Sequence, residues 1–334
     1  MGQSRSRWAL LALAVCGLAL RPWPACAGTV KVNAVVNGVI TDIIFYIGKE
    51  KKYFEKEGLE IYIVPMPVTG SVSSAQALAN GTVDVAPLPF GANLLGLMRQ
   101  SGIRIVGDYS RRVKGKPTTE YHLVRKDLAS QIRTVADIKG RRVAMPTPAI
   151  WNYALFLRDL ENAGLSEADF DGRAVSNSVL PSMLANKKLD VAVSVAEPLA
   201  SRLIDMGLAQ VLAGSDIAKE SWPITQLCYS KRFMRDPQAG RRFMVAVLRS
   251  IRAFYRATPE ELNAFAVKTW GMPVDPKALS KLDMVRDGRI DLQALAAAQD
   301  YALKKGWLKS KVDIKDLIDP SYIGYANDAL RREE

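Results

Sequence analysis

Cysteine and histidine are scarce in this chain of 334 residues, which contains three cysteines and one histidine, His122. Cys16 and Cys26 lie among the first 27 residues, and only Cys228 lies beyond them. Once those residues are removed, no intramolecular disulfide can form, and a lone thiol is more often packed than catalytic. The sequence also lacks a P-loop, metal-ligand spacing and a Ser/His/Asp arrangement. Nothing in it predicts a metal, a cofactor or a nucleophilic active site.

Long apolar runs are also missing, except at the N-terminus. There Arg5 and Arg7 precede the apolar stretch WALLALAVCGLAL, and Ala25-x-Ala27 follows it. This pattern predicts a secretory signal peptide over residues 1–27, cleaved after Ala27. The alternatives are an uncleaved membrane anchor and a lipid anchor at Cys26, but WPAC lacks the aliphatic residue that usually stands three positions before a lipidated cysteine. The remaining chain is expected to be exported and soluble.

The charge balance is strongly basic, with a formal net charge of +12. Removal of the signal takes away Arg5, Arg7 and Arg21 and no acidic residue, so the charge falls by three. In an intracellular protein this excess would suggest nucleic acid as a partner. An exported protein does not routinely meet nucleic acid, so we expect none. The excess would instead favour anionic surfaces and anionic solutes.

A phrase near the start of the chain returns later. LANGTVDVA begins at Leu78 and LANKKLDVA at Leu184, and the same separation carries Gly58 onto Gly164. Around each copy, strand and helix patterns alternate: strands near 30–36, 59–64 and 82–88 with helices near 43–57 and 69–80, then strands near 141–145, 172–176 and 189–195 with helices near 153–164 and 181–186. Alternation of this kind indicates βαβ units and parallel sheets. The sequence predicts an α/β fold of two similar lobes around a cleft.

The segments outside the repeat complete the predicted domain organisation. Basic residues, glycine and proline near 108–124 suggest a first crossing between lobes, and a second is expected near 220–230. The prediction is therefore a first part of lobe 1 at 28–124, lobe 2 at 125–221, and a return to lobe 1 with C-terminal helices at 222–334. Phe243, Val247, Ile251 and Phe254 recur at helical spacing, which predicts a helix packed on lobe 1.

Several segments resemble one known family. GKEKKYFEKEGLEIYIV, ALANGTVDVA, TVADIKGRRVAMPTPA and LDVAVSVAEPLA are similar to segments of the periplasmic solute-binding proteins for sulfonates, nitrate, taurine and thiamine precursors. The resemblance covers nearly the whole chain after the signal. It implies a type II periplasmic-binding-protein fold, a periplasmic location, a monomer, a small-molecule solute and an ABC permease in the inner membrane as partner.

The predicted ligand-binding residues lie in loops at the carboxyl ends of the strands, where open parallel sheets bind their ligands. These loops contain no lysine or arginine, and their only charged residues are Asp42 and Glu197. An anion would be held by hydroxyl, amide and backbone donors, or Glu197 would accept hydrogen bonds from an amine or aminopyrimidine. Arg111, Arg112 and Lys114 at the first crossing could reach the cleft. The candidates are Asn37, Thr69, Gly70, Ser71, Ser73, Phe90, Thr147, Trp151, Asn152, Ser176, Ser194 and Glu197.

Each candidate also has a purely structural interpretation. Phe90, Trp151 and the neighbouring Tyr153 would either sandwich a ring-shaped solute or pack beneath the loops. Thr147 followed by Pro148 is typical of a helix start, and Asp42 is a candidate helix cap. The two aspartates of the repeat, Asp84 and Asp190, are expected to be scaffold rather than a catalytic pair, because they occupy equivalent places in separate lobes.

The functional hypothesis is therefore a non-enzymatic solute-binding component of an ABC importer, specific for a small organic anion of sulfonate or carboxylate type or for a nitrogen heterocycle. The alternative is an enzyme of the same fold acting on a pyrimidine or cofactor precursor. His122 weighs against that alternative, because it stands in an extended segment without a neighbouring nucleophile. Delivery of the solute to a membrane sensor instead of a permease is equally compatible with the sequence.

Overall fold

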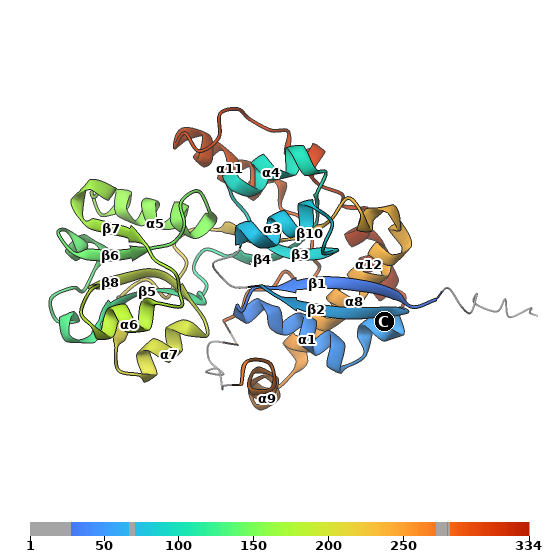
Figure 1. The fold of residues 1–334 in the computed structure, drawn as a ribbon, viewed down its shortest axis with the longest axis horizontal. Coiled ribbons are helices and arrows are strands. Elements are labelled where there is room, and N and C mark those ends of the chain that lie inside the picture. Colours follow the sequence, from blue (N-terminus) through green and yellow to red (C-terminus); the bar gives the residue numbers. More distant parts are fainter. Residues whose placement is uncertain (1–27, 67–70, 272–278, 280, 334) are drawn as a thin grey trace, which may run out of the picture.

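The chain forms two lobes, each built on its own sheet of five strands (Figure 1). The structure is a computed structural model that describes residues 28–66, 71–271, 279 and 281–333. The predicted signal peptide lies outside the described residues. Within them, none of the helices combines the length and the apolar character that crossing a bilayer requires.

The sheet of lobe 1 has the order β2-β1-β3-β10-β4. β1 is parallel to both β2 and β3, whereas β10 is antiparallel to β3 and β4. β10 is the strand that returns from lobe 2, so its reversed direction follows from the crossing. The strands are β1 (Val30–Val36), β2 (Leu59–Pro65), β3 (Val85–Pro89), β4 (Arg104–Arg112) and β10 (Trp222–Tyr229).

The sheet of lobe 2 repeats this arrangement in the order β7-β6-β8-β5-β9. β6 is parallel to β7 and β8, and β5, the strand that arrives from lobe 1, is antiparallel to β8 and β9. The prediction of two similar α/β lobes with largely parallel sheets is confirmed. The strands are β5 (Glu120–Arg125), β6 (Arg142–Met145), β7 (Asp171–Ala174), β8 (Val191–Ala196) and β9 (Ala209–Val211).

The two crossings lie beside each other and form the hinge between the lobes. Pro117 pairs with Ile217, and the amide of Thr118 donates to the carbonyl of Asp216 over 2.9 Å. The first crossing ends earlier along the chain than the sequence suggests, because β5 pairs with the second sheet from Glu120 onward. The loops that follow β1, β3, β6 and β8 point toward this region from both sides.

Helices cover both sheets. The helix predicted over 43–57 is interrupted at Lys52, which has a φ of 57°, and the break lets the ring of Phe54 pack against Gly48, where a Cβ would have no room. Gly58 ends this region with a φ of 67°, as expected of a C-terminal glycine. The helices are α1 (Ile43–Glu50), α2 (Tyr53–Lys56), α3 (Ser71–Ala79), α4 (Ala92–Ser101), α5 (Trp151–Asn162), α6 (Leu180–Ala185), α7 (Leu199–Asp205), α8 (Pro237–Arg256), α9 (Pro259–Trp270), α11 (Leu292–Lys304) and α12 (Ser321–Arg331).

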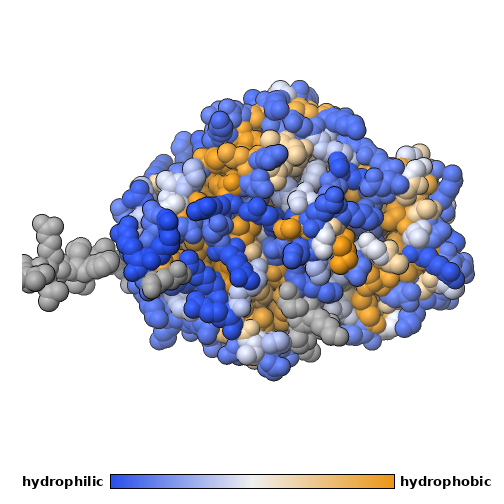
Figure 2. All heavy atoms as spheres, turned by 180° about the vertical axis from the view of Figure 1, so that it is seen from behind, coloured by the Kyte–Doolittle hydropathy of each residue, from blue (hydrophilic) through white to orange (hydrophobic). Residues whose placement is uncertain are grey.

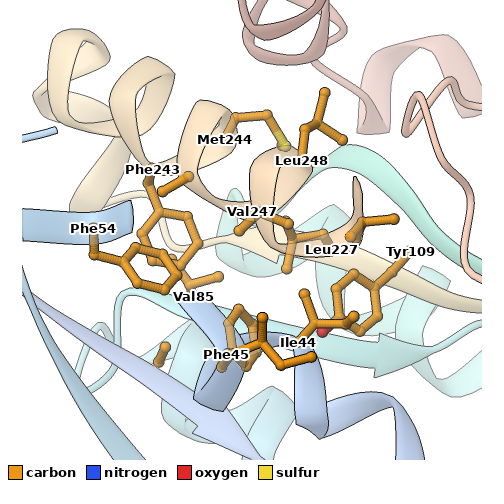
Figure 3. Packing of buried hydrophobic residues seen from close by; sticks show 14 of the residues in the cluster. Ile44, Phe45, Phe54, Val85, Tyr109, Leu227, Phe243, Met244, Val247 and Leu248 are labelled. Atoms are coloured by element: carbon orange, nitrogen blue, oxygen red, sulfur yellow. The ribbon is translucent and has the colours of Figure 1, made fainter. Parts of the chain in front are cut away.

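The C-terminal helices pack against lobe 1. Phe243 and Val247 of α8 are fully buried against Phe45, Phe54 and Tyr109, with the Phe54 and Phe243 ring centroids 5.1 Å apart (Figure 3). The helical spacing found in the sequence therefore marks the buried face of α8. On the opposite side from that of Figure 1, polar residues cover much of the surface and apolar residues gather in separate patches (Figure 2).

The repeated phrases serve the same structural purpose in both lobes. Asp84 accepts a hydrogen bond from the amide of Asn33 on β1 over 2.9 Å, and Asp190 accepts one from the amide of Arg142 on β6 over 3.0 Å. Each aspartate is buried and also pairs with arginine. They lie in separate lobes and tie the start of one strand to the next, which agrees with the expectation that they are scaffold.

Helix α5 belongs to the hydrophobic cores of both lobes. Trp151, Ala154 and Leu155 join the cluster formed by β3, α4, β10 and α11 of lobe 1, while Phe156 and Leu157 join the cluster of lobe 2. Around it, the guanidinium of Arg158 lies 5.8 Å from the ring of Trp222 and 5.5 Å from that of Tyr301.

Candidate functional site

A cavity of about 410 Å³ lies between the lobes, at the carboxyl ends of the strands. Its walls come from the loops after β1, β6 and β7, from the C-terminal parts of β3 and β8, from β10, from the first crossing, and from the segment 281–283 near the C-terminal helices. The size is that of pockets for small organic molecules. Apolar side chains such as Ile40, Ile150, Leu180, Val193 and Ile224 form much of the lining.

Half of the predicted ligand-binding residues line this cavity. They come from both lobes and are Asn37, Thr147, Trp151, Asn152, Ser176 and Ser194. Ser73 is exposed on α3 and is not part of the lining. Thr69 and Gly70 lie outside the described residues, and for Ser71 the structure describes only the backbone, as the first residue of α3.

Phe90 and Glu197 are placed away from the cavity, so their predicted positions are corrected. Phe90 continues the pairing with β10 through its amide, which donates to the carbonyl of Ile224 over 2.8 Å, and its ring is buried in the lobe 1 core. Glu197 is buried at the start of α7, where its carboxylate accepts the amide of Ser201 over 3.0 Å and its hydroxyl over 2.8 Å. The acid therefore serves its own helix.

The aromatic residues at the start of α5 separate into two roles. Trp151 is only 5% exposed; it packs in the lobe 1 cluster and contributes to the cavity wall. Tyr153 points elsewhere: its ring lies tilted against that of Trp307, with centroids 5.6 Å apart, and its hydroxyl donates to Glu167. Of the predicted aromatic sandwich, only Trp151 reaches the cavity.

The prediction of a helix start at Thr147 and Pro148 is wrong. The helix begins at Trp151, because the loop first reaches across to lobe 1: Ile150 pairs with Gly91, and the carbonyl of Ala149 accepts the amide of Ala92 over 3.2 Å. A Cβ at Gly91 would lie 2.5 Å from that carbonyl oxygen, so this contact between the lobes requires glycine.

In lobe 1, a buried carboxylate holds the cavity loop after β1. Asp42 Oδ2 accepts the backbone amides of Asn37 over 2.9 Å and Val39 over 3.0 Å. The Asn37 side chain then donates to the carbonyl of Pro87 over 3.0 Å and accepts the hydroxyl of Ser74 over 2.8 Å. Burial raises the pKa of Asp42 to about 7, although these amides oppose the shift. The predicted cap thus fixes the backbone around a cavity residue.

In lobe 2, the C-terminal part of β8, which lines the cavity, is held through a histidine. His122 Nδ1 accepts the backbone amide of Ser194 over 3.0 Å, so its Nε2 carries the proton and donates to Asp159 over 3.2 Å. Lys219 pairs with the other oxygen of Asp159 over 2.7 Å. Burial raises the pKa of Asp159, but the contacts with His122 and Lys219 outweigh it and hold that pKa below its usual range. Ser194 has a φ of 52°, which this network stabilises.

No pattern in the sequence indicates that Asp159, His122 and Ser194 meet, because they lie on three separate elements, α5, β5 and β8. Their geometry differs from that of an activated serine. The histidine contacts the Ser194 amide rather than its hydroxyl, and that hydroxyl is 3.5 Å from the carbonyl of Asn152. The thiol of Cys228 is fully buried, and burial raises its pKa strongly, which makes it a poor nucleophile.

Charged residues enter the cavity from elements outside the predicted loops. Arg111 and Arg112 line it, as considered from the sequence, and Glu120, Lys281 and Asp283 join them. Lys114 does not line the cavity. No local pattern could have identified Lys281 and Asp283, because the C-terminal block has no partner copy in the repeat.

Two of these charged residues, Arg111 and Lys281, also contact polar side chains of the protein itself. Arg111 pairs with Asp108 over 3.1 Å and with Asp291 over 3.4 Å. Lys281 Nζ lies 3.4 Å from the Tyr121 hydroxyl and so connects the C-terminal segment to lobe 2. Among the described residues, no group of three or more His, Cys, Asp or Glu side chains could hold a metal ion.

Comparison with known proteins identifies the family. Residues 41–262, more than half of the chain, match the family described as NMT1/THI5 like, and the chain belongs to that family. No curated protein matches the chain.

Solved structures share its fold at low sequence identity. The alkanesulfonate-binding protein SsuA from Xanthomonas axonopodis pv. citri, bound to MOPS, has a TM-score of 0.67 at 18% identity over 88% of this chain and 99% of its own. The periplasmic aliphatic sulphonate-binding protein SsuA from Escherichia coli has 0.65 at 18% over 90% and 100%. The periplasmic nitrate-binding protein NrtA from Synechocystis PCC 6803 has 0.70 at 14% over 91% and 89%. The predicted periplasmic-binding-protein fold is confirmed.

Proposed function

We propose that the protein is the extracytoplasmic solute-binding component of an ABC importer, exported to the periplasm, which delivers a small organic solute to a membrane permease. The solute is an organic anion of sulfonate or carboxylate type or a nitrogen heterocycle. The observation that carries the proposal is the cavity of about 410 Å³, to which both lobes and the hinge contribute. The ligands of two similar proteins, which bind alkanesulfonates and nitrate, support the solute class.

The arrangement suits a two-state receptor. A solute in this cavity contacts Asn37 of lobe 1 and Ser194 of lobe 2 together only when the lobes are closed. The binding free energy is therefore larger for the closed state, and the solute shifts the population toward it. A permease that recognises the closed state would then respond to the loaded protein.

Binding without turnover is part of the proposal. Its support is that both ring nitrogens of His122 are engaged, one by a backbone amide and the other by Asp159, and that the Cys228 thiol is buried. A nucleophile and a base within mutual hydrogen-bond reach are what covalent catalysis needs. The cavity instead offers donors and acceptors for holding a solute.

A stability screen tests the proposal. Thermal and denaturant unfolding are measured with alkanesulfonates, taurine, nitrate, aromatic carboxylates and aminopyrimidines. A bound solute at about 100 times its Kd adds roughly 2.7 kcal/mol to the free energy of unfolding. Stabilisation by none of these solutes would contradict the proposed classes. Chemical conversion of a solute during incubation would contradict binding without turnover.

A matched pair of variants assigns the effect to the cavity. Ala174 is exposed at the end of β7 and lines the cavity, so Ala174→Trp fills part of it without disturbing a core. Ala185 is equally exposed at the end of α6, away from the cavity. We expect Ala174→Trp to lose the stabilisation by solute and Ala185→Trp to keep it. Equal stabilisation of both variants would place the solute elsewhere.

A further inference from the structure

Two opposite charges meet at the hinge, one from each lobe. Arg112 is the last residue of β4, where it lies opposite Trp222 of β10. Glu120 is the first residue of β5, where it lies opposite Ala196 of β8. The sheets therefore fix both backbones, and both side chains line the cavity between the lobes.

Each of the two side chains has a buried polar atom without a hydrogen-bond partner within the part of the chain that the structure describes. Arg112 Nε and Glu120 Oε2 are buried and have no hydrogen-bond partner there. Ser110 Oγ, two residues before Arg112 and hence on the same face of β4, is a third such atom, and Ser110 also lines the cavity. Buried polar groups in folded proteins are almost always paired, and an unpaired buried charge costs still more. Three unpaired groups at one cavity indicate that something else pairs with them.

Burial acts on the two charges as expected. It lowers the pKa of Arg112, against the charges of Glu120, Asp159 and Glu220. It raises the pKa of Glu120 to about 8, against the charge of Arg112. The neighbouring Arg111 provides the contrast: it pairs with Asp108 and Asp291 and donates to the carbonyl of Arg289 over 2.9 Å. Arg111 thus has protein partners for its guanidinium, whereas Arg112 Nε has none among the described residues.

On the basis of the proposed solute-binding function, we propose that Arg112 and Glu120 form a subsite for an amphoteric solute, which carries an acidic group and an N–H donor on one small apolar body. The guanidinium of Arg112 and the hydroxyl of Ser110 hold the acidic group, and Glu120 accepts the N–H donor. The apolar wall formed by Ile150, Trp151 and Leu282 covers the body of the solute. A simple anion would leave Glu120 without an N–H donor.

The subsite also couples recognition to closure. Arg112 is the last residue of β4 in lobe 1, and Glu120 is the first residue of β5 in lobe 2. A solute that pairs with both side chains therefore connects the two lobes directly at the hinge. An anion that pairs with Arg112 alone lacks this connection. The amino group of the solute, on this account, contributes to closure as well as to affinity.

The first test needs no solute. If the two groups are kept for a ligand, the double variant Arg112→Met/Glu120→Gln melts at a higher temperature than the wild type when no solute is present, because a guanidinium and a carboxyl group that have buried atoms without hydrogen-bond partners are replaced by uncharged side chains. Lys114→Met, an exposed charge in the same crossing, is the control and leaves the melting temperature unchanged. A cavity of about 20 Å³ behind the pair has room for one water. If the charges are a structural pair bridged by such a water, the double variant melts lower, and the inference is overturned.

The second test uses pairs of solutes that differ only in the amino group: 2-aminoethanesulfonate with ethanesulfonate, and 4-aminobenzoate with benzoate. Calorimetry on the wild type is expected to show at least tenfold tighter binding of the amino member of a pair, which corresponds to about 1.4 kcal/mol. Glu120→Gln removes this preference, and Arg112→Met weakens both members. If the wild type binds the amino and the non-amino member of each pair with equal affinity, the inference is overturned and the proposed function stays intact. If no solute of the whole panel binds the wild type, the proposed function fails instead, and the melting temperatures alone decide the inference.

Discussion

The two lobes share a scaffold but hold their cavity loops by different means. Both sheets have the same strand order, and Asp84 and Asp190 brace equivalent strand starts. In lobe 1, however, Asp42 holds the backbone of the loop at Asn37 directly. In lobe 2, the carboxylate of Asp159 reaches Ser194 only through the ring of His122.

The difference separates scaffold from site. Sequence that the lobes have in common fixes the sheets, and sequence that they do not share fixes the cavity. The contact of Asp42 with the loop amides depends on the protonation and burial of its carboxylate. The contact in lobe 2 depends on the position of the His122 ring between Asp159 and Ser194. The two loops should therefore respond differently to substitution and to pH.

The largest expected effect concerns the shared aspartates. Asp190 contacts two arginines, Arg125 over 2.9 Å and Arg142 over 2.6 Å, whereas Asp84 contacts only the half-exposed Arg232. Asp190→Ala leaves the buried Arg125 with the half-exposed Asp127 as its remaining ion-pair partner among the described residues, and should lower the free energy of unfolding by about 3–5 kcal/mol. Asp84→Ala should lower the free energy of unfolding by about 1–3 kcal/mol, mainly because the amide of Asn33 loses its acceptor. Denaturant titration measures both. Equal losses would mean that the two braces are equivalent in strength as well as in position.

The next effect concerns the loop of lobe 2. His122→Ala removes the acceptor for the Ser194 amide and the donor to Asp159, so the cavity loop loses its fixed conformation. We expect a loss of about 1–3 kcal/mol in unfolding free energy for the unpaired groups and roughly tenfold weaker solute binding, about 1.4 kcal/mol. Calorimetry with a solute found in the screen measures the affinity. His122→Gln, which keeps one acceptor, serves as the control and should recover part of the affinity. Unchanged affinity in a folded His122→Ala protein would show that Ser194 needs no support.

The last effect concerns pH and the loop of lobe 1. Because the pKa of Asp42 is about 7 in the folded protein and 3.8 in the reference state, the native state binds the extra proton between these values. Its contribution to stability is therefore present at pH 4 and is lost as the pH rises through 7. Asp42→Asn should make the decline between pH 4 and 7 less steep, by at most about 1.4 kcal/mol per pH unit.

Three further acids, Asp108, Glu120 and Asp283, shift in the same direction, so the decline does not vanish in that variant. Burial also raises the pKa of Asp108 to about 7 and that of Glu120 to about 8. Asp137→Asn is the matched control, because amide donors lower the pKa of Asp137 and its contribution is lost only on acidification below pH 4. A slope between pH 4 and 7 that is the same in the wild type and Asp42→Asn would contradict the assignment to Asp42.

Local periodicity explains why so much of the fold could be predicted. The alternation of strands and helices, the repeat, and the buried face of α8 are properties of short stretches of chain, and the structure follows them closely. The break at Lys52 was missed because it depends on Phe54 finding room beside Gly48, which no spacing of apolar residues reveals.

The candidate site was predictable only where it follows from strand ends. Asn37 and Ser194 line the cavity because parallel strands of both sheets end there. Phe90 was misplaced because its direction depends on pairing with β10, a strand that is more than a hundred residues away in sequence. Glu197 was misplaced because it satisfies Ser201 at the start of its own helix. The pair Arg112 and Glu120 arises where strands of two different sheets meet, and such a meeting has no local signature.

The double membership of α5 bears on how the protein unfolds. Its Trp151 face is part of the lobe 1 core and its Phe156 face is part of the lobe 2 core. Loss of lobe 2 would therefore expose apolar surface of lobe 1, and loss of lobe 1 would strip α5 from lobe 2. Two lobes joined only by crossing strands could unfold independently. Lobes whose cores share a helix unfold together, as one cooperative unit. For the full chain this means a single thermal transition, in which damage to either lobe lowers the stability of both.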